Sequence, residues 1–363
     1  MRGSPVWSYA RGRPVPGDRI GPWLEASWQR LLRASRSGER GTDPALVAVD
    51  RRLPSELYWR AVREVVPVAE ARAALRAAGA IVRTEGSDRG LVGASAAVAW
   101  PGRRSTWELI AYRASERWGR PRDVSAASVR KVAGREPSLF LCDDPRTRRL
   151  LVAPHTPCPI LYGLRGTSPE GPLRARRGVR SEPVERWLLF RTNQGTGDHL
   201  ARRPIRDIRP FMGAIVSGTV RAVPSVLEGG HVAFELEGAE GDALPCVAFE
   251  PTKLLPRVAR SLAPGDHLQV WGSRAKGPAL HLEGIRLVRI APRWGPVRPP
   301  RCPGCDRPSH SLGRQRGYRC PSCRRRWPPE AARRVARPPA YPPGEYHPTA
   351  SARRHLAPRA PEL

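Results

Sequence analysis

Four cysteines in the C-terminal part of the chain have the spacing of a metal site. Cys302-Pro-Gly-Cys305 and Cys320-Pro-Ser-Cys323 are two CxxC pairs separated by 14 residues. Two residues between thiolates allow both sulfurs to approach one ion, and two such turns supply the tetrahedral set that zinc prefers. Four protein ligands leave no open position for a reacting water. We therefore expect structural zinc bound by Cys302, Cys305, Cys320 and Cys323.

A second group of polar side chains is the segment Arg191-Thr-Asn-Gln-Gly-Thr-Gly-Asp-His-Leu200, here called the polar loop (residues 191–200). It follows an apolar stretch, and loops at strand ends often present ligand-binding groups. A solvated connector is the alternative. The side chains expected to face a substrate are Thr192, Asn193, Gln194, Thr196 and His199.

Two further segments have residue types suited to chemistry. In residues 154–166, prolines restrict the backbone, His155 could transfer a proton, and Arg165 could bind a phosphate or carboxylate. In residues 89–94, the glycines would let backbone N–H groups approach a phosphate, which makes Arg89, Gly90 and Gly93 candidate nucleotide contacts. The alternative for this second segment is a turn before a buried strand.

The acidic pair Asp143-Asp144 could hold a cation, although a hairpin turn is the favoured interpretation. The sequence contains no Ser-His-Asp arrangement, nucleophile elbow or Walker lysine pattern. Chemistry by those routes is therefore not expected.

The elements that must position these residues change character along the chain. Helical spacing predicts helices near residues 23–32, 57–66 and 68–75. The pattern of residues 106–192 predicts strand, helix, strand, strand, helix, strand, a βαββαβ order typical of a ferredoxin-like unit. Its expected strands are 107–112, 139–142, 150–153 and 187–191, and its expected helices are 125–133 and 173–179.

From residue 210 to residue 290 the apolar period becomes two, without a strong helix. Five short strands with Gly and Pro turns predict an OB-type barrel, with an SH3-like barrel as the alternative. The expected strands are 214–220, 231–236, 246–249, 268–271 and 280–288. Residues 328–363 are rich in Pro and Arg without an apolar pattern, so they are expected to be disordered.

Charge indicates the kind of partner. The chain has 363 residues, and 63 Lys and Arg against 33 Asp and Glu give a net charge of +30. A chain this basic is typical of proteins that bind nucleic acid. No run approaches the ~20 apolar residues that span a bilayer, and no secretory signal is evident. We expect a cytoplasmic protein without a membrane partner.

The polar loop resembles the RTNQGTDxHL signature of archaeal agmatidine synthetases, which modify the wobble cytidine of an isoleucine tRNA. Residues 154–166 resemble their PHTPCPVxYGIRG segment, and Glu108-Leu-Ile-Ala-Tyr-Arg113 and Arg89-Gly-Leu-Val-Gly-Ala94 also fit. The similarity extends from about Pro44 to Trp327. Two departures are present: Gly197 displaces the loop aspartate to Asp198, and residues 1–44 lack the acidic IGIDDTDS-like strand and GGCTT-like segment that serve ATP.

The resemblance implies an N-terminally truncated or divergent member of this family, an α+β multidomain protein. It implies an ATP-dependent, AMP-forming ligase that joins agmatine to C2 of the cytidine in a CAU anticodon and so enables AUA decoding. Implied cofactors are ATP, Mg²⁺ and structural zinc, implied partners are that tRNA and agmatine, and a monomer is favoured. The alternative is a tRNA-binding protein that lacks the ATP site. The expected domains are an incomplete kinase-like, ATP-handling region (1–104), a ferredoxin-like domain with the polar loop (105–205), an OB fold (206–295), a zinc ribbon (300–327) and a disordered tail (328–363).

Overall fold

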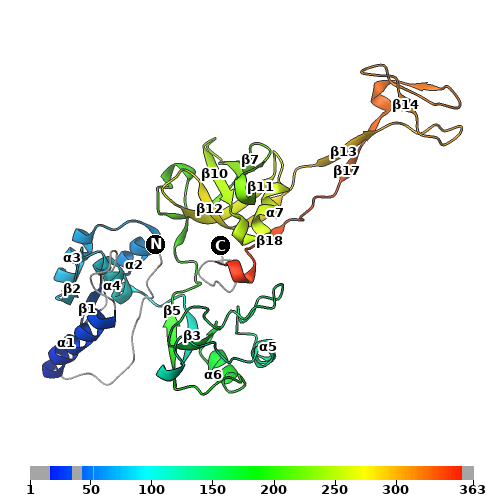
Figure 1. Cartoon of the computed structure of the whole chain (residues 1–363). Helices are drawn as coiled ribbons and strands as arrows, with labels where there is room; N and C mark the ends of the chain where they lie inside the picture. Colours follow the sequence, from blue (N-terminus) through cyan, green and yellow to red (C-terminus); the bar gives the residue numbers. More distant parts are fainter. Residues whose placement is uncertain (1–16, 35–42, 52, 354–363) are drawn as a thin grey trace.

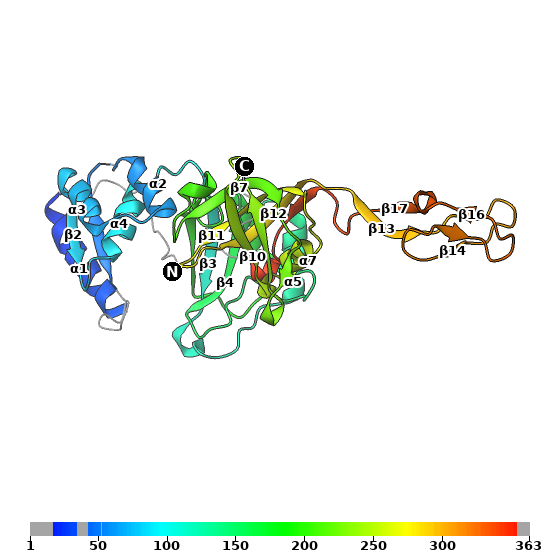
Figure 2. The same cartoon turned by 90° about the horizontal axis from the view of Figure 1, so that it is seen from above.

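The computed structural model describes residues 17–34, 43–51 and 53–353 and places four units along an extended molecule (Figure 1). An N-terminal helical unit and a small three-stranded unit lie near a β-barrel, and a two-stranded arm carries a small β module away from it (Figure 2). In the part of the chain that the structure describes, no helix has both the length and the apolar composition needed to cross a membrane.

The N-terminal unit packs helices around a short two-stranded antiparallel sheet, and the three predicted helices are confirmed. Its elements are α1 (Gly17–Ala34), β1 (Ala45–Ala48), α2 (Ser55–Arg63), α3 (Val68–Ala77), β2 (Ile81–Thr84) and α4 (Gly90–Ala99). The alternative for residues 89–94, a turn before a buried strand, is wrong, because residues 90–99 form α4. Its alanines have high helix propensity, and Leu91, Ala96 and Ala99 are buried at helical spacing.

The three-stranded unit has the order β4-β3-β5 with antiparallel pairs. Its elements are β3 (Thr106–Tyr112), α5 (Ala126–Arg135), β4 (Ile160–Gly166), α6 (Glu170–Arg176) and β5 (Arg186–Thr192). The predicted strand 139–142 is reduced to one bridge, Leu139 to Gly166, on the outer side of β4. With that bridge counted as a residual strand, the spatial order is that of a ferredoxin-like sheet.

The expected strand at 150–153 is wrong, since Leu150 makes only an isolated bridge to Asp143. The third strand is β4, which lies just after a proline-rich segment that masked its start. Nearly all residues of β4 are buried in succession. The strand therefore lacks the alternation of apolar and polar residues by which half-buried strands are recognised.

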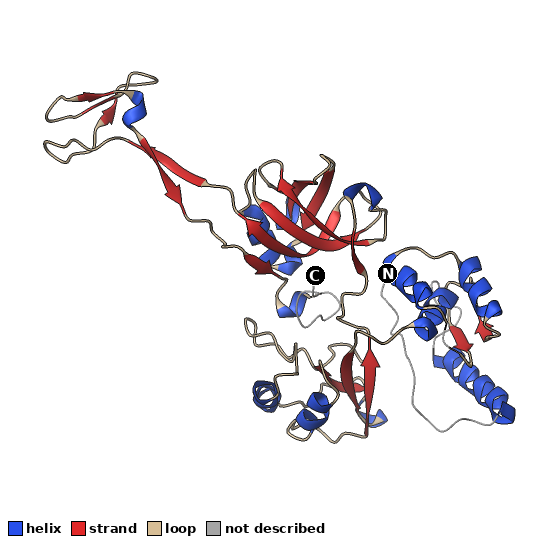
Figure 3. Ribbon diagram, turned by 180° about the vertical axis from the view of Figure 1, so that it is seen from behind, coloured by secondary structure: helices blue, strands red, loops and turns tan. Residues whose placement is uncertain are grey.

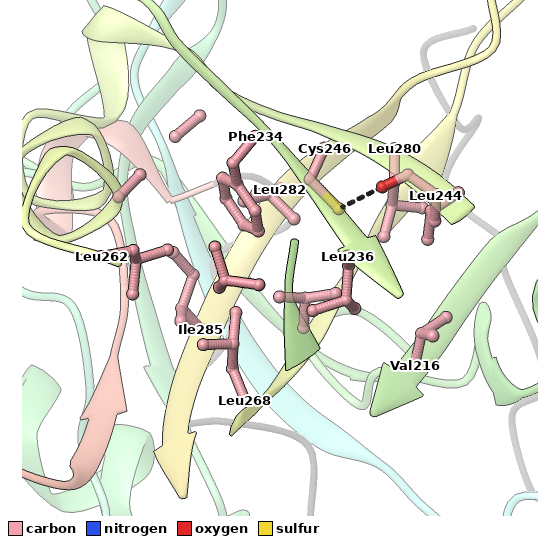
Figure 4. Packing of buried hydrophobic residues seen from close by; sticks show 14 of the residues in the cluster. Val216, Phe234, Leu236, Leu244, Cys246, Leu262, Leu268, Leu280, Leu282 and Ile285 are labelled. Atoms are coloured by element: carbon pink, nitrogen blue, oxygen red, sulfur yellow. Dashed lines mark hydrogen bonds between the residues drawn. The ribbon is translucent and has the colours of Figure 1, made fainter. Parts of the chain in front are cut away.

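The barrel has the five predicted strands and is closed. They are β7 (Gly213–Val220), β9 (Val232–Glu237), β10 (Ala243–Ala248), β11 (His267–Arg274) and β12 (Leu280–Arg289), in the order β7-β11-β12-β10-β9 with β9 pairing back to β7. Only β10 and β12 are parallel among these pairs, as in an OB fold, and the SH3-like alternative is not supported. The strands curve around one another to form the barrel (Figure 3). Short α7 (Leu254–Arg260), which was not predicted from the sequence, packs against the apolar interior whose side chains are drawn in Figure 4.

Two minor strands flank the barrel, and the arm carries the cysteine module. β6 (Leu200–Arg202) runs parallel to β7, and β8 (Ser225–Val226) pairs with β9. The arm consists of β13 (Arg293–Arg298) and β17 (Arg333–Arg337), and the module contains β14 (His310–Ser311), β15 (Tyr318–Arg319) and β16 (Arg326–Trp327). Short 3-10 segments are η1 (Ser115–Arg117), η2 (Ile205–Asp207), η3 (Glu228–Gly230), η4 (Glu250–Thr252), η5 (Pro329–Ala331) and η6 (Ala350–Ala352).

The expectation of a disordered tail is wrong for residues 328–353. β17 pairs with β13 of the arm, and β18 (Gly344–Tyr346) adds to the barrel beside β12. Tyr341 and Tyr346 pack against the barrel core. These partners are distant in sequence, so local composition gives no sign of them. Residues 354–363 lie outside the described residues.

Candidate functional site

A narrow cleft on the three-stranded sheet brings together residues from separate segments. It is lined by Thr106, Glu108, Phe140, Arg165, Thr192 and Gln194. Because β4, β3 and β5 are neighbours, Glu108 lies directly between Arg165 and Phe190 in the strand register. Three residues singled out from the sequence, Arg165, Thr192 and Gln194, therefore do meet in one place.

Two of the lining residues, Glu108 and Arg165, form an ion pair. Arg165 Nη2 lies 2.9 Å from Glu108 Oε1, and each side chain is only 16% exposed. Among the described residues, Arg165 Nε and Nη1 are buried without a hydrogen-bond partner. Gly163 leaves room for the carboxylate, since a Cβ there would lie 2.8 Å from Glu108 Oε1. Unpaired buried donors are costly, so this guanidinium is suited to receive an acceptor oxygen from a ligand.

The start of the polar loop is folded onto the rim of the cleft by its own hydrogen bonds. Thr106 Oγ1 donates to the Gln194 carbonyl at 2.7 Å, and Gln194 N–H donates to Thr192 Oγ1 at 3.0 Å. The Thr196 hydroxyl donates to the Asn193 carbonyl at 2.8 Å. Thr196 therefore shapes the loop, whereas Thr192 and Gln194 line the cleft.

The middle of the polar loop contacts the N-terminal unit. Tyr58 Oη of α2 donates to Asp198 Oδ2 at 2.7 Å, and Asn193 Nδ2 donates to the same hydroxyl at 3.1 Å. Arg63 Nε donates to the Asp198 carbonyl at 3.0 Å. Burial, together with the bond to Asp198, raises the pKa of Tyr58, so the phenol stays protonated and donates. Tyr58 could not be identified from the sequence, because its partner Asp198 lies 140 residues away.

The end of the polar loop contacts the barrel. His199 Nε2 lies 3.1 Å from Glu283 Oε2 of β12, and Ser273 Oγ donates to Glu283 Oε1 at 2.9 Å. Gly213 of β7 lies so close beneath the loop that a Cβ would collide with the His199 carbonyl. His199 is thus placed at the junction with the barrel and is not among the residues that line the cleft.

His155 also lies apart from the cleft. Its Nε2 accepts from Arg149 Nε at 2.9 Å in an exposed loop. That loop is held by Arg122, whose guanidinium donates to the carbonyls of Pro154, Thr156, Cys158 and Ile160 at distances of 2.7–3.1 Å. Arg122 was not identified from the sequence, where nothing links it to this loop.

The candidate phosphate contacts, Arg89, Gly90 and Gly93, lie at the start of α4. The carboxylate of Asp43 already accepts hydrogen bonds from donors at this position. Asp43 Oδ1 accepts from Ser87 N–H at 2.9 Å, and Asp43 Oδ2 accepts from Arg89 Nε at 2.8 Å. The bond from Ser87 N–H is the main reason that the pKa of Asp43 is lowered. A Cβ at Gly90 would collide with the Asp43 carbonyl, whereas one at Gly93 would contact nothing. A phosphate role for Arg89, Gly90 and Gly93 stays a prediction.

The acidic pair behaves as a turn. Asp144 Oδ1 accepts from Arg146 N–H at 3.0 Å, and Asp143 Oδ2 accepts from Arg130 Nε at 3.0 Å. The bond from Arg146 N–H is typical of a turn, which is the interpretation favoured from the sequence, and the bond from Arg130 anchors the turn to α5.

The four predicted zinc ligands converge. The Sγ atoms of Cys302, Cys305, Cys320 and Cys323 all lie within 4.8 Å of one another. The Cys323 N–H donates to Cys320 Sγ, and this bond is the main reason that the pKa of Cys320 falls to about 7. Four sulfur ligands that converge in this way form the set that structural zinc prefers.

A ferredoxin-like unit, an OB barrel and a four-cysteine ribbon on one strongly basic chain are typical of multidomain proteins that bind nucleic acid. Comparison with known proteins narrows this class. Residues 88–199 match the TiaS FLD domain, and residues 299–338 match the TiaS C-terminal zinc ribbon domain.

Whole-chain relatives agree with these domain matches. The chain is 33% identical over 326 residues to the isoleucine tRNA 2-agmatinylcytidine synthetase TiaS of Methanocaldococcus jannaschii, covering 87% of this chain and 76% of that protein. A crystal structure of TiaS in complex with its isoleucine tRNA and ATP matches with a TM-score of 0.84 and 32% identity, over 99% of this chain and 87% of that one. A complex of TiaS with the same tRNA, AMPCPP and agmatine matches with a TM-score of 0.79 and 30% identity, over 95% and 82%.

The chain belongs to the isoleucine tRNA 2-agmatinylcytidine synthetase (TiaS) family. The family predicted from the polar loop and the proline-rich segment is confirmed. The α+β multidomain class with an OB barrel and a zinc ribbon is confirmed as well.

Proposed function

We propose that this chain attaches agmatine to C2 of the wobble cytidine in an isoleucine tRNA with a CAU anticodon, with ATP split to AMP. The observation that carries the proposal is the match of nearly the whole chain to the TiaS synthetases, within which Glu108 and Arg165 meet Thr192 and Gln194 at the cleft. All four residues lie within the segment that matches the TiaS FLD domain. The modified tRNA would decode AUA.

Each side chain in the cleft has a part that suits this reaction. ATP, which we expect to act with Mg²⁺, supplies the activation that the C2 oxygen of cytosine needs to leave. Agmatine is cationic, and the Glu108 carboxylate is the negative group that can receive it. Arg165, with two unpartnered donors, holds an acceptor oxygen, and Thr192 and Gln194 fix the orientation of the base.

The other units supply binding energy. A wobble base must leave its stack before C2 can react, and contacts elsewhere on the tRNA must offset that cost. The barrel and the zinc ribbon, on a chain of net charge +30, are the parts suited to bind the rest of the tRNA. We expect the protein to act in the cytoplasm as a monomer.

The alternative, a tRNA-binding protein without an ATP site, is not favoured. Solved relatives whose names include ATP, or an ATP analogue and agmatine, align with nearly the whole of this chain. The two unpartnered donors of Arg165 also argue against this alternative. Buried unpaired donors cost stability unless a ligand binds them, and a protein that only binds tRNA would not need them in the cleft.

Intact-mass measurement of an isoleucine tRNA transcript with a CAU anticodon, after incubation with the chain, ATP, Mg²⁺ and agmatine, tests the proposal. We expect a gain equal to agmatine minus water. Gln194→Ala should lower the rate at least about tenfold, because it removes a group that holds the base. The control is Gln29→Ala, a similarly exposed glutamine on α1. No gain together with retained tRNA binding would favour the alternative and reject the ligase.

A further inference from the structure

A groove separate from the cleft lies between the N-terminal unit and the strand that leads into the barrel. It has a volume of about 290 Å³ and is lined by Trp59, Arg60, Arg63 and Glu64 of the α2 region and by Ala201, Arg202 and Arg203 at β6. The cleft shares none of these residues. The reaction proposed above leaves this groove without a role.

The groove has more positive than negative groups. Four arginines face one carboxylate, Glu64, which pairs with Arg203 at 3.2 Å. Arg60 pairs with Glu70 outside the groove, and Arg202 is exposed. Within the described chain, Arg203 Nε is buried without a hydrogen-bond partner. The lining therefore has spare positive charge and a spare donor.

Arginines also crowd one another here. Arg63 stacks over the Trp59 ring, with its guanidinium carbon 4.4 Å from the ring centroid. Burial is the main cause that lowers the pKa of Arg63, and the nearby charges of Arg203 and Arg104 lower it further. Like charges held together are unfavourable until an anion binds between them. Glu64 is the one carboxylate among the described lining residues, so the charge of these arginines is not balanced within the groove.

We propose that this groove binds a phosphodiester group of the RNA backbone, as a site distinct from the cleft that holds the reacting base. The inference rests on the proposed function, because it assumes an RNA substrate. A guanidinium cluster fits phosphate oxygens, and a chain of net charge +30 favours a polyanion over an isolated anion. Arg63 also donates to the Asp198 carbonyl of the polar loop, so RNA held here would be placed relative to the cleft.

The test compares two double variants of the full chain that lose the same charge. Arg60→Gln with Arg202→Gln removes two groove arginines and leaves in place Arg63, which donates to the polar loop. Arg76→Gln with Arg135→Gln is the control, because both arginines are exposed in the last turns of α3 and α5. The measurement is the Kd for the isoleucine tRNA transcript at several salt concentrations, with thermal melting to check folding.

We expect the groove variant to bind tRNA roughly tenfold more weakly, and the slope of log Kd against log salt to fall by about 1 to 2. The control should stay within about threefold of wild type. Arg202→Gln alone, at an exposed position, should give part of the effect without loss of folding.

Other outcomes overturn the inference in distinguishable ways. If wild type binds tRNA and the groove variant matches the control, the groove inference fails and the proposed function stands. If wild type does not bind tRNA, both fail. A parallel titration with ATP covers the other source of phosphate: loss of ATP binding with unchanged tRNA binding would assign the groove to a free nucleotide and reject the RNA site.

Discussion

The hydroxyl of Tyr58 donates a 2.7 Å hydrogen bond to the carboxylate of Asp198, which lies 140 residues further along the chain. Asn193 donates to the same hydroxyl, so one phenol contacts the polar loop at two points. Both Tyr58 and Asp198 are buried. The N-terminal unit therefore positions the loop whose first residues line the cleft.

Tyr58→Phe should destabilise the protein by about 1–3 kcal/mol, because it leaves the buried Asp198 carboxylate without the phenol donor. Urea unfolding of the full chain measures the change. The control is Tyr346→Phe, whose exposed hydroxyl donates only to the Pro342 carbonyl and which should change stability by less than about 0.5 kcal/mol. Equal effects of the two substitutions would contradict a structural role for the Tyr58–Asp198 bond.

Glu108→Gln should lower kcat/KM for agmatine at least about tenfold, since the amide keeps the shape of the carboxylate but not the charge that receives a cation. Binding of the tRNA should change little, because most of its binding energy is assigned to the barrel and the zinc ribbon. Agmatine titration of the reaction rate measures the effect. An unchanged kcat/KM would remove Glu108 from the agmatine site.

Parts of this architecture that rest on local patterns were predictable. The CxxC spacing identified all four zinc ligands, and the period of two located the five barrel strands. The polar loop stood out because its hydrogen-bonding side chains are consecutive. In each case the information lies within a few neighbouring residues.

Features that depend on distant partners were not predictable. Glu108 and Arg165 become a pair only because β3 and β4 are adjacent, and His199 contacts Glu283 only because the barrel closes nearby. Residues 333–346 are structured because β17 pairs with β13 and β18 pairs with β12. No periodicity within a segment encodes such a partner.

The two glycines at the start of α4 should respond differently to alanine. A Cβ at residue 90 would collide with the Asp43 backbone, so Gly90→Ala should cost about 1–3 kcal/mol. Gly93 has open space and helical backbone, so Gly93→Ala should be neutral or stabilise by up to about 1 kcal/mol. Thermal unfolding compares the two. Similar losses at both positions would contradict the packing explanation.

The buried ion pair between Arg113 and Glu182 should make stability depend on pH. The side chains are 1% and 2% exposed, and Arg113 donates to both carboxylate oxygens at 2.8 and 2.9 Å. Burial alone would raise the pKa of Glu182, but the bonds from Arg113 and Asp123 N–H outweigh it and lower the pKa. The stabilisation is therefore fully present above the unfolded pKa of about 4.3 and is lost as pH falls through the lower folded value.

Glu182→Gln should cost about 3 kcal/mol at pH 7, because it leaves a buried guanidinium without its counter-charge. The gap between the unfolding free energies of wild type and variant should narrow below about pH 4, as the unfolded carboxylate and then, at lower pH, the folded carboxylate become protonated. Urea unfolding across pH measures both effects, with exposed Glu170→Gln as the control. A gap that stays constant with pH would argue against an ionised pair.

Zinc should be required for the order of residues 300–327. Buried residues in this described module are Cys302, Ser309, Gly317 and Cys320, so it has no apolar core of its own. Chelation should make the module sensitive to protease while the barrel, with its own large core, remains intact. Elemental analysis should find one zinc ion per chain, lost in Cys305→Ser and kept in Cys158→Ser, which alters a cysteine outside the module. Protease resistance that survives complete zinc removal would mean that the arm strands, rather than the metal, hold the module together.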